Sequence, residues 1–217
     1  MTRAKICGLT TPETLDTALD HGAAFVGAVI FEKSPRHLEP LHAATLFERA
    51  KGRAKVVAVV VDPGDMLLTE IGLILRPDFI QLHGSETPER AAEIRRLTGA
   101  GIIKALPIRE LEDFGDALVW EPVVDHLMFD AKPEPGSVLP GGVGARFDWS
   151  LPATFERERG RFQKPWFLAG GLTPDNVAEA VRVSGAALVD VSSGVESAPG
   201  VKDAGRIAAF LKAVARS

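Results

Sequence analysis

The sequence predicts an α/β fold, a (β/α)8 TIM barrel that occupies residues 1–217 as a single domain. Eight short β-rich runs alternate with segments that suit helices, a pattern typical of parallel βαβ units. The length of 217 residues fits a compact barrel, for which about 200 residues is the lower limit. Glycine turns follow the last two runs, where barrels often bind phosphate. An open, doubly wound sheet is the alternative.

The expected strands are 4–8, 25–30, 55–61, 79–83, 102–106, 125–130, 166–169 and 187–192. Threonine-proline-acid triplets at 11–13, 87–89 and 173–175 predict helix starts. In each triplet the threonine can cap the helix, the proline fits the first position and the acid complements the positive end. The segment 131–146 is longer than an ordinary βα connection of about 2–6 residues. We therefore expect a functional loop above the barrel mouth.

Composition restricts the partners and the location of the protein. Hydrophobic residues make up 46% and charged residues 25%, as in ordinary globular proteins. The net charge of −4 gives no general attraction for nucleic acid or an anionic membrane, and the apolar runs are shorter than the roughly 20 residues of a membrane span. The N-terminus leads into the first strand without a signal peptide, so a cytoplasmic location is expected. A monomer is the default and a dimer the alternative, because no long apolar stripe stands out.

The only cysteine, Cys7, ends the first expected strand, at the edge that carries the chemistry in α/β folds. A lone thiol serves either by burial, the commonest fate of a free cysteine, or by reactivity. Strand alternation puts Lys5 on the same face, where its charge would favour the thiolate. Alternatively, Lys5 pairs with an interior carboxylate, Asp62 or Asp190, and holds the barrel together.

Asp130 ends the sixth expected strand, and alternation places it on one face with His126 and Met128. If that face is the interior, Asp130 lies at the barrel mouth, where desolvation raises the pKa of a carboxyl group and suits it to act as a general acid. Alternatively, Asp130 only caps the loop or pairs with Lys132.

Three late segments combine glycine with hydroxyl or backbone donors. The candidate phosphate-binding residues are Gly142, Gly144, Gly170, Gly171, Ser192, Ser193 and Gly194. Each cluster alone is typical of an ordinary turn. At successive strand ends, however, such clusters favour a phosphate site made of backbone N–H groups.

Two side chains in the expected loops are candidates for contact with a substrate. Arg36 follows the second strand in a proline-stiffened loop, where a guanidinium can bind a carboxylate with two parallel hydrogen bonds. A surface arginine without a specific role is the alternative. His83 ends the fourth strand and either lines the mouth or is structural. The five histidines show neither HExxH nor HxH spacing, so no metal site is expected.

Seven motifs together resemble the phosphoribosylanthranilate isomerase family of tryptophan biosynthesis. They are KICGLT at 5–10, SPRHL at 34–38, QLHG at 81–84, FDAK at 129–132, FDWS at 147–150, AGGLTPDNV at 169–177 and DVSSGVE at 190–196. They occur in the order of the family and run from the first strand to the last. The resemblance therefore covers essentially the whole chain.

The resemblance implies an Amadori rearrangement of N-(5-phosphoribosyl)anthranilate, a small phosphosugar substrate, without a metal or an organic cofactor. It implies that Cys7 is the general base and Asp130 the general acid. Arg36 is then expected to contact the anthranilate carboxylate, and Asp190 to accept a hydrogen bond from the amino nitrogen of the substrate. Because the acid must arrive protonated and the base deprotonated, we expect a raised pKa for Asp130 and a lowered pKa for Cys7.

The chain departs from the family in the loop after the sixth strand. Val143 stands where the family usually has serine or threonine, and Arg146 follows where small or polar residues are common. We expect Arg146 to compensate by its charge.

Three rival functions remain. An indole-glycerol-phosphate synthase needs a lysine at the end of the third strand, where this chain reads VVVD at 59–62. The histidine-pathway isomerase uses aspartates on the first and fifth strands, which here end in Cys7 and in KAL at 104–106. A non-catalytic phosphate-binding barrel has no need of an acid and a base.

Overall fold

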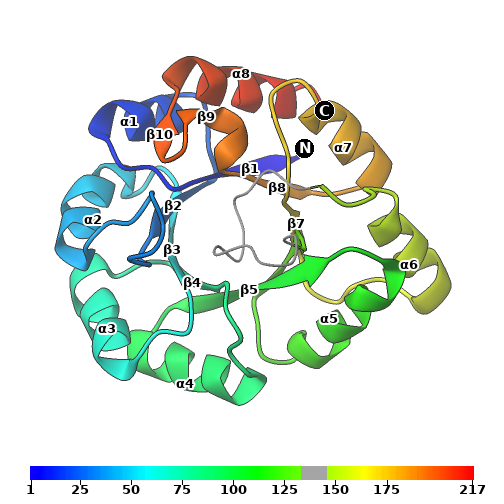
Figure 1. Cartoon of the computed structure of the whole chain (residues 1–217), viewed down its shortest axis with the longest axis horizontal. Coiled ribbons are helices and arrows are strands. Elements are labelled where there is room, and N and C mark those ends of the chain that lie inside the picture. The colour runs from blue at the N-terminus through cyan, green and yellow to red at the C-terminus, as the bar shows by residue number, and fades with distance from the viewer. Residues whose placement is uncertain (133–145) are drawn as a thin grey trace.

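The computed structural model describes residues 1–132 and 146–217, in which eight parallel strands close into a barrel surrounded by helices (Figure 1). The strands are β1 (Arg3–Cys7), β2 (Phe25–Val29), β3 (Lys55–Val60), β4 (Phe79–Leu82), β5 (Gly101–Ile108), β6 (His126–Ala131), β7 (Trp166–Leu168) and β8 (Leu188–Val191). Each strand pairs with its neighbours, and β8 pairs with β1. The predicted barrel is therefore confirmed, the open sheet is excluded, and the expected strand ends differ from the observed ones by no more than two residues.

The helices alternate with the strands and cover the outside of the barrel (Figure 1). They are α1 (Pro12–Asp20), α2 (Pro40–Phe47), α3 (Asp65–Glu70), α4 (Pro88–Thr98), α5 (Gly115–Trp120), α6 (Leu151–Arg159), α7 (Val177–Ser184) and α8 (Ala204–Val214). A helical turn, η4 (Ser193–Val195), and a two-stranded hairpin, β9 (Glu196–Ala198) with β10 (Val201–Lys202), stand between β8 and α8. Over the described residues, no helix is both long and apolar enough to cross a bilayer.

Two of the three predicted helix starts are confirmed. The side chains of Thr11 and Thr87 cap α1 and α4, each accepting a hydrogen bond from the backbone N–H three residues on. The third prediction is wrong, because α7 begins at Val177 and not just after Thr173. The side chain of Asn176 accounts for the delay: its Oδ1 accepts a hydrogen bond from the Thr173 N–H and its Nδ2 donates to the Gly171 carbonyl. A local turn thus replaces the expected first turn of helix.

The core has an outer layer between strands and helices and an inner layer inside the barrel. Aromatic rings fill the inner layer near the amino ends of the strands, where Phe25 contacts Phe79, His126 and Phe167 at centroid distances of 5.1 to 6.0 Å. This packing closes the barrel at that end. A catalytic site is therefore expected at the other end of the barrel, where the strands finish.

Candidate active site

Cys7 lies in the barrel interior at the end of β1, beside a buried ion pair. The side chain of Lys5 is wholly buried, and its Nζ donates a hydrogen bond to Asp190 Oδ1 on β8 at 2.7 Å. Of the two partners expected for Lys5, Asp190 is therefore the correct one; Asp62 instead accepts a hydrogen bond from the Ser85 N–H. A Cβ on Gly27 of β2 would lie 3.1 Å from Cys7 Sγ, so this glycine makes room for the thiol.

The electrostatics of Cys7 differ from the prediction. Burial raises the pKa of the thiol, and the nearby charge of Lys5 opposes this effect without overcoming it. The expectation of a lowered pKa for Cys7 is therefore wrong. The physical reason is that Asp190 already compensates Lys5: burial disfavours the ammonium, but Asp190 and Cys7 more than offset this and raise the pKa of Lys5 to about 12.

Asp130 is a buried carboxyl near the end of β6 and contacts a histidine. Its Oδ2 lies 3.2 Å from Nε2 of His83, just beyond β4, and its Oδ1 accepts a hydrogen bond from the Ala131 N–H. Lys132 instead lies 3.5 Å from Asp113, so the predicted alternative of an Asp130–Lys132 pair is wrong. The structure therefore brings two predicted site residues, Asp130 and His83, into direct contact.

Gln81 is a neighbour of the site for which the sequence predicts no role. It is buried in the barrel, and its Nε2 lies 3.0 Å from Nδ1 of His83. Its Oε1 is buried and accepts no hydrogen bond among the described residues. Strand alternation was the available signal, since residues 81 and 83 share one face of the expected strand 79–83.

Arg36 is buried at the end of the loop after β2, so the alternative of a surface arginine is wrong. Its Nε and Nη2 donate to the two carboxylate oxygens of Glu196 at 2.6 and 2.8 Å. Lys202, also buried, donates to the same carboxylate at 2.6 Å. Glu196 and Lys202 were not predicted; the only sequence signal was that Glu196 ends the DVSSGVE motif.

The candidate phosphate residues after β7 and β8 form two loops in direct contact. Gly170 and Gly171 adopt φ values of +85° and +63°, a region that favours glycine. A Cβ on Gly194 would lie 1.8 Å from the Leu172 carbonyl oxygen, so only glycine fits between these loops. Ser192, at the end of β8, donates a hydrogen bond to the Cys7 carbonyl and so ties its loop to β1.

The structure describes only part of the loop after β6. Gly142, Val143 and Gly144 lie outside the described residues. Arg146 is exposed, and its guanidinium lies 5.8 Å from the ring centre of Trp149. Within 1–132 and 146–217, no three histidine, cysteine or acidic side chains are grouped as metal ligands.

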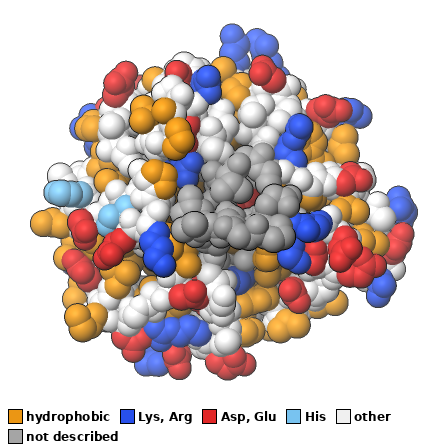
Figure 2. Space-filling model, viewed as in Figure 1, with side chains coloured by type: hydrophobic (Ala, Val, Ile, Leu, Met, Phe, Trp, Pro, Cys, Tyr) orange, Lys and Arg blue, Asp and Glu red, His pale blue; other side chains and the backbone are white. Residues whose placement is uncertain are grey.

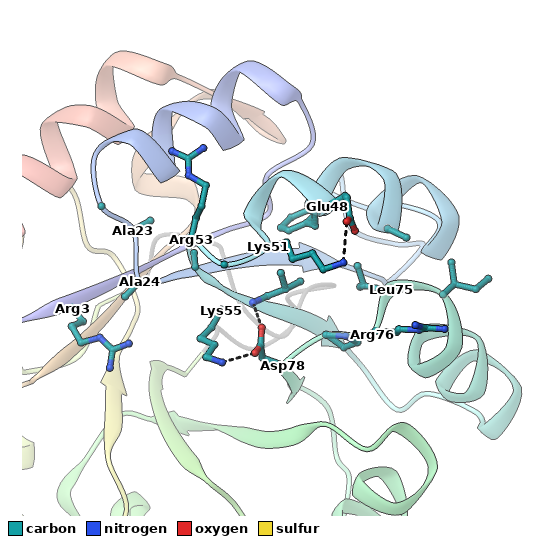
Figure 3. A pocket seen from close by; sticks show the side chains of 18 of the residues that line it. Arg3, Ala23, Ala24, Glu48, Lys51, Arg53, Lys55, Leu75, Arg76 and Asp78 are labelled. Atoms are coloured by element: carbon teal, nitrogen blue, oxygen red, sulfur yellow. Dashed lines mark hydrogen bonds and ion pairs between the residues drawn. The ribbon is translucent and has the colours of Figure 1, made fainter.

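A cavity of about 990 Å³ lies at the opposite end of the barrel, beside the amino ends of β1, β2 and β3 (Figure 3). Lys51 pairs with Glu48 and Lys55 with Asp78 there. In Figure 3 the side chains of Arg53 and Arg76 point away from each other, so the basic groups do not converge on one point. Figure 2 shows the other end of the barrel, where the strands finish, with acidic and basic side chains interspersed around the rim. The candidate active site is therefore the cluster around Cys7, Asp130 and Arg36.

Comparison with known proteins gives a consistent result. The model of the N-(5'-phosphoribosyl)anthranilate (PRA) isomerase family matches residues 4–213. An N-(5'-phosphoribosyl)anthranilate isomerase of Caulobacter vibrioides is 54% identical over 215 residues, which cover 99% of this chain and 96% of the relative.

Two solved structures are similar over their whole length and that of this chain. A phosphoribosyl anthranilate isomerase in complex with reduced 1-(o-carboxyphenylamino)-1-deoxyribulose 5-phosphate has a TM-score of 0.85 at 30% identity, with 100% of both chains covered. Monomers generated from the dimeric isomerase of Thermotoga maritima have a TM-score of 0.83 at 30% identity, again with 100% of both chains covered. The whole chain therefore resembles these proteins, in sequence and in fold.

Proposed function

The chain belongs to the N-(5'-phosphoribosyl)anthranilate isomerase family and has this isomerase activity in tryptophan biosynthesis, and from that premise we propose that Cys7 is the general base and Asp130 the general acid. The observation that carries the proposal is the position of both groups: they are buried side chains near the carboxyl ends of β1 and β6, where barrel enzymes hold their catalytic residues. The rival synthase, the histidine-pathway isomerase and the non-catalytic barrel are excluded by the family match.

The reaction needs one proton delivered and one removed. Asp130 protonates the ring oxygen of the ribose, which opens the ring and leaves a protonated imine at C1'. Cys7 then removes the C2' proton, and the electrons of that bond shift to the imine to give an enolamine. Tautomerisation yields 1-(2-carboxyphenylamino)-1-deoxyribulose 5-phosphate. Proton transfers of this kind by positioned side chains typically contribute about 10²- to 10⁴-fold to a rate.

The buried ion pair supports the role of Cys7 in spite of its raised pKa. Lys5 remains an ammonium at neutral pH, and its field stabilises the thiolate when the proton leaves. The thiolate is therefore a minority form at neutral pH and increases with pH. A raised pKa also makes the thiolate a stronger base, which offsets part of the loss from its smaller population.

The substrate is proposed to bind between the loops at this end. Arg36 contacts the anthranilate carboxylate, and the loops with Gly170, Gly171 and the residues 192–194 bind the phosphate. Gly142 and Gly144 remain predicted contributors. His83 is proposed to orient Asp130, which it contacts at 3.2 Å, and Asp190 to accept a hydrogen bond from the amino nitrogen.

The role of Cys7 is tested by adding the protein to freshly formed phosphoribosylanthranilate and following the loss of anthranilate-type fluorescence. Wild type consumes the substrate, and Cys7→Ala is at least about 10²-fold slower, the lower range for loss of a general base. Equal rates for the two proteins contradict the assigned mechanism. The cytoplasmic location stays a prediction.

The oligomeric state also stays a prediction. The sequence favours a monomer by default, whereas the relative from Thermotoga maritima is described as dimeric. Sedimentation equilibrium at catalytic concentrations decides between the two.

A further inference from the structure

We propose that Glu196 is a positioning residue, which holds Arg36 in the orientation that meets the substrate carboxylate and ties this end of the site to the Ser192 loop. The inference rests on the proposed contact between Arg36 and that carboxylate. It concerns a residue of the β9–β10 hairpin that the proposed mechanism does not use.

The carboxylate of Glu196 accepts four hydrogen bonds, two at each oxygen. Oε1 accepts hydrogen bonds from Arg36 Nε and Lys202 Nζ, both at 2.6 Å, and Oε2 accepts from Arg36 Nη2 and the Gly200 N–H at 2.8 and 3.2 Å. Although burial opposes ionisation, the hydrogen bonds from Arg36 and Lys202 hold the pKa of Glu196 below its usual range. Glu196 is therefore a carboxylate at neutral pH.

The fork between Glu196 and Arg36, that is, the two hydrogen bonds from Arg36 Nε and Nη2 to the two carboxylate oxygens, fixes the plane of the guanidinium. Two parallel N–H···O bonds define both the position and the orientation of an arginine head group, which a single contact does not. A long, otherwise rotatable side chain is thus held in one orientation before the substrate arrives, which reduces the entropy cost of binding.

The hairpin also fixes the backbone of the Arg36 loop. Gly200, in the turn of the hairpin, has φ of +81°, and a Cβ there would lie 2.6 Å from the Pro35 carbonyl oxygen. The hairpin therefore packs directly against the residue before Arg36. Side chain and loop are restrained by the same element.

Lys202 connects this cluster to the other end of the substrate site. Its Nζ donates to the Ser192 carbonyl at 2.9 Å and lies 3.2 Å from the Ser192 hydroxyl, while it pairs with Glu196. Arg36, Lys202 and Glu196 thus form one buried, hydrogen-bonded ionic cluster.

If Glu196 acted only through its charge, Glu196→Gln would change ligand binding in one direction; if it acts by positioning Arg36, the change is in the opposite direction. Glu196→Gln removes a negative charge beside Arg36, which by Coulomb's law alone would tighten the binding of an anionic ligand. The amide, however, offers one acceptor atom in place of two and turns an N–H₂ group toward existing donors. If Glu196 acts by positioning, the same substitution weakens binding.

Calorimetric titration with two ligands tests the proposal. One ligand is reduced 1-(o-carboxyphenylamino)-1-deoxyribulose 5-phosphate, and the other is its counterpart without the carboxylate. Glu196→Gln is expected to bind the first ligand about 10- to 100-fold more weakly, the range for loss of hydrogen bonds to charged groups. The affinity for the second ligand is expected to stay within about threefold, so the preference for the carboxylate is lost.

Glu196→Asp separates position from charge and serves if Glu196→Gln does not fold. It keeps the charge but withdraws the carboxylate by one methylene group, and a selective loss of about 10-fold for the carboxylated ligand is expected. The matched control is Glu121→Gln, since Glu121 is a buried acid that accepts hydrogen bonds from the backbone N–H groups of Gln163 and Lys164 away from the site. It is expected to bind both ligands as wild type does.

The outcomes separate the positioning role of Glu196 from the proposed contact between Arg36 and the carboxylate. Tighter binding of the carboxylated ligand by Glu196→Gln, equal losses for both ligands, or a wild-type preference in Glu196→Asp each overturn the positioning role. A wild-type protein that binds both ligands equally well contradicts instead the proposed contact between Arg36 and the carboxylate.

Discussion

Replacement of Lys5 by methionine tests the buried ion pair that supports Cys7. Methionine keeps most of the apolar stem of the side chain but removes the ammonium that lies 2.7 Å from Asp190 Oδ1. Lys5 is fully buried and Asp190 nearly so, and the bond joins β1 to β8 where the barrel closes. The substitution therefore leaves a buried carboxylate without its cation.

The expected cost follows from this geometry. Removal of one partner of a buried ion pair typically costs about 3–5 kcal/mol in unfolding free energy. For a domain of this size, about 2–4 °C per kcal/mol converts this loss to a fall of about 6–20 °C in the melting temperature. Replacement of both partners by apolar residues of similar volume is often close to neutral. Lys5→Met/Asp190→Leu is therefore expected to recover most of the stability that Lys5→Met loses.

Urea unfolding gives the unfolding free energies of wild type, Lys5→Met, Asp190→Leu and the double variant. Together, these four free energies form a double-mutant cycle. The expected coupling between positions 5 and 190 is at least about 2 kcal/mol, within the range for residues in direct contact. A loss below about 1 kcal/mol in Lys5→Met, or a double variant that loses the sum of the two single losses, would show that the ion pair does not hold the barrel closed.

Three further substitutions test the site and its electrostatics. Arg146→Ala is expected to raise KM severalfold with little change in kcat, and an unchanged KM removes Arg146 from the site. Gly194→Ala would place a Cβ 1.8 Å from the Leu172 carbonyl oxygen, so a loss of about 1–3 kcal/mol in unfolding free energy and a higher KM are expected; wild-type stability and KM argue against close contact of the two loops. Because burial raises the pKa of Cys7, the folded state keeps the thiol proton that the unfolded chain releases above its pKa of about 8.5, so stability falls as pH rises through this range. Cys7→Ala is expected to flatten that fall in urea unfolding between about pH 8 and pH 10, and an identical slope contradicts the raised pKa.

The barrel was predictable because its signals are local. Each buried strand is a short apolar run followed by turn residues, and that pattern needs no knowledge of distant contacts. The start of α7 was missed because the side chain of Asn176 offers the backbone of Thr173 another partner, and sequence pattern alone does not weigh that competition.

The positions of the site residues were also predictable, but their electrostatics were not. Alternation places Lys5 and Cys7 on one face of β1, as the structure has them. The direction of the pKa shift of Cys7, however, depends on burial and on how completely Asp190 compensates Lys5. Both quantities arise only when β1 and β8 meet. In the same way, the fork between Arg36 and Glu196 joins residues 160 positions apart, and no short motif contains both.

The pH dependence of kcat/KM for freshly formed phosphoribosylanthranilate tests the role of Cys7 as the base most directly. The reactive form carries a single proton on the pair of Asp130 and Cys7, so kcat/KM of wild type has a bell-shaped pH profile. Because burial raises the pKa of Cys7, the alkaline limb of this profile lies beyond about 8.5, the ordinary pKa of a thiol. Cys7→Ser is expected to be at least about 10²-fold slower and to lose this alkaline limb, because a serine hydroxyl does not ionise in that range. A Cys7→Ser profile that keeps the wild-type alkaline limb would assign the ionisation to another group and contradict the role of Cys7 as the base.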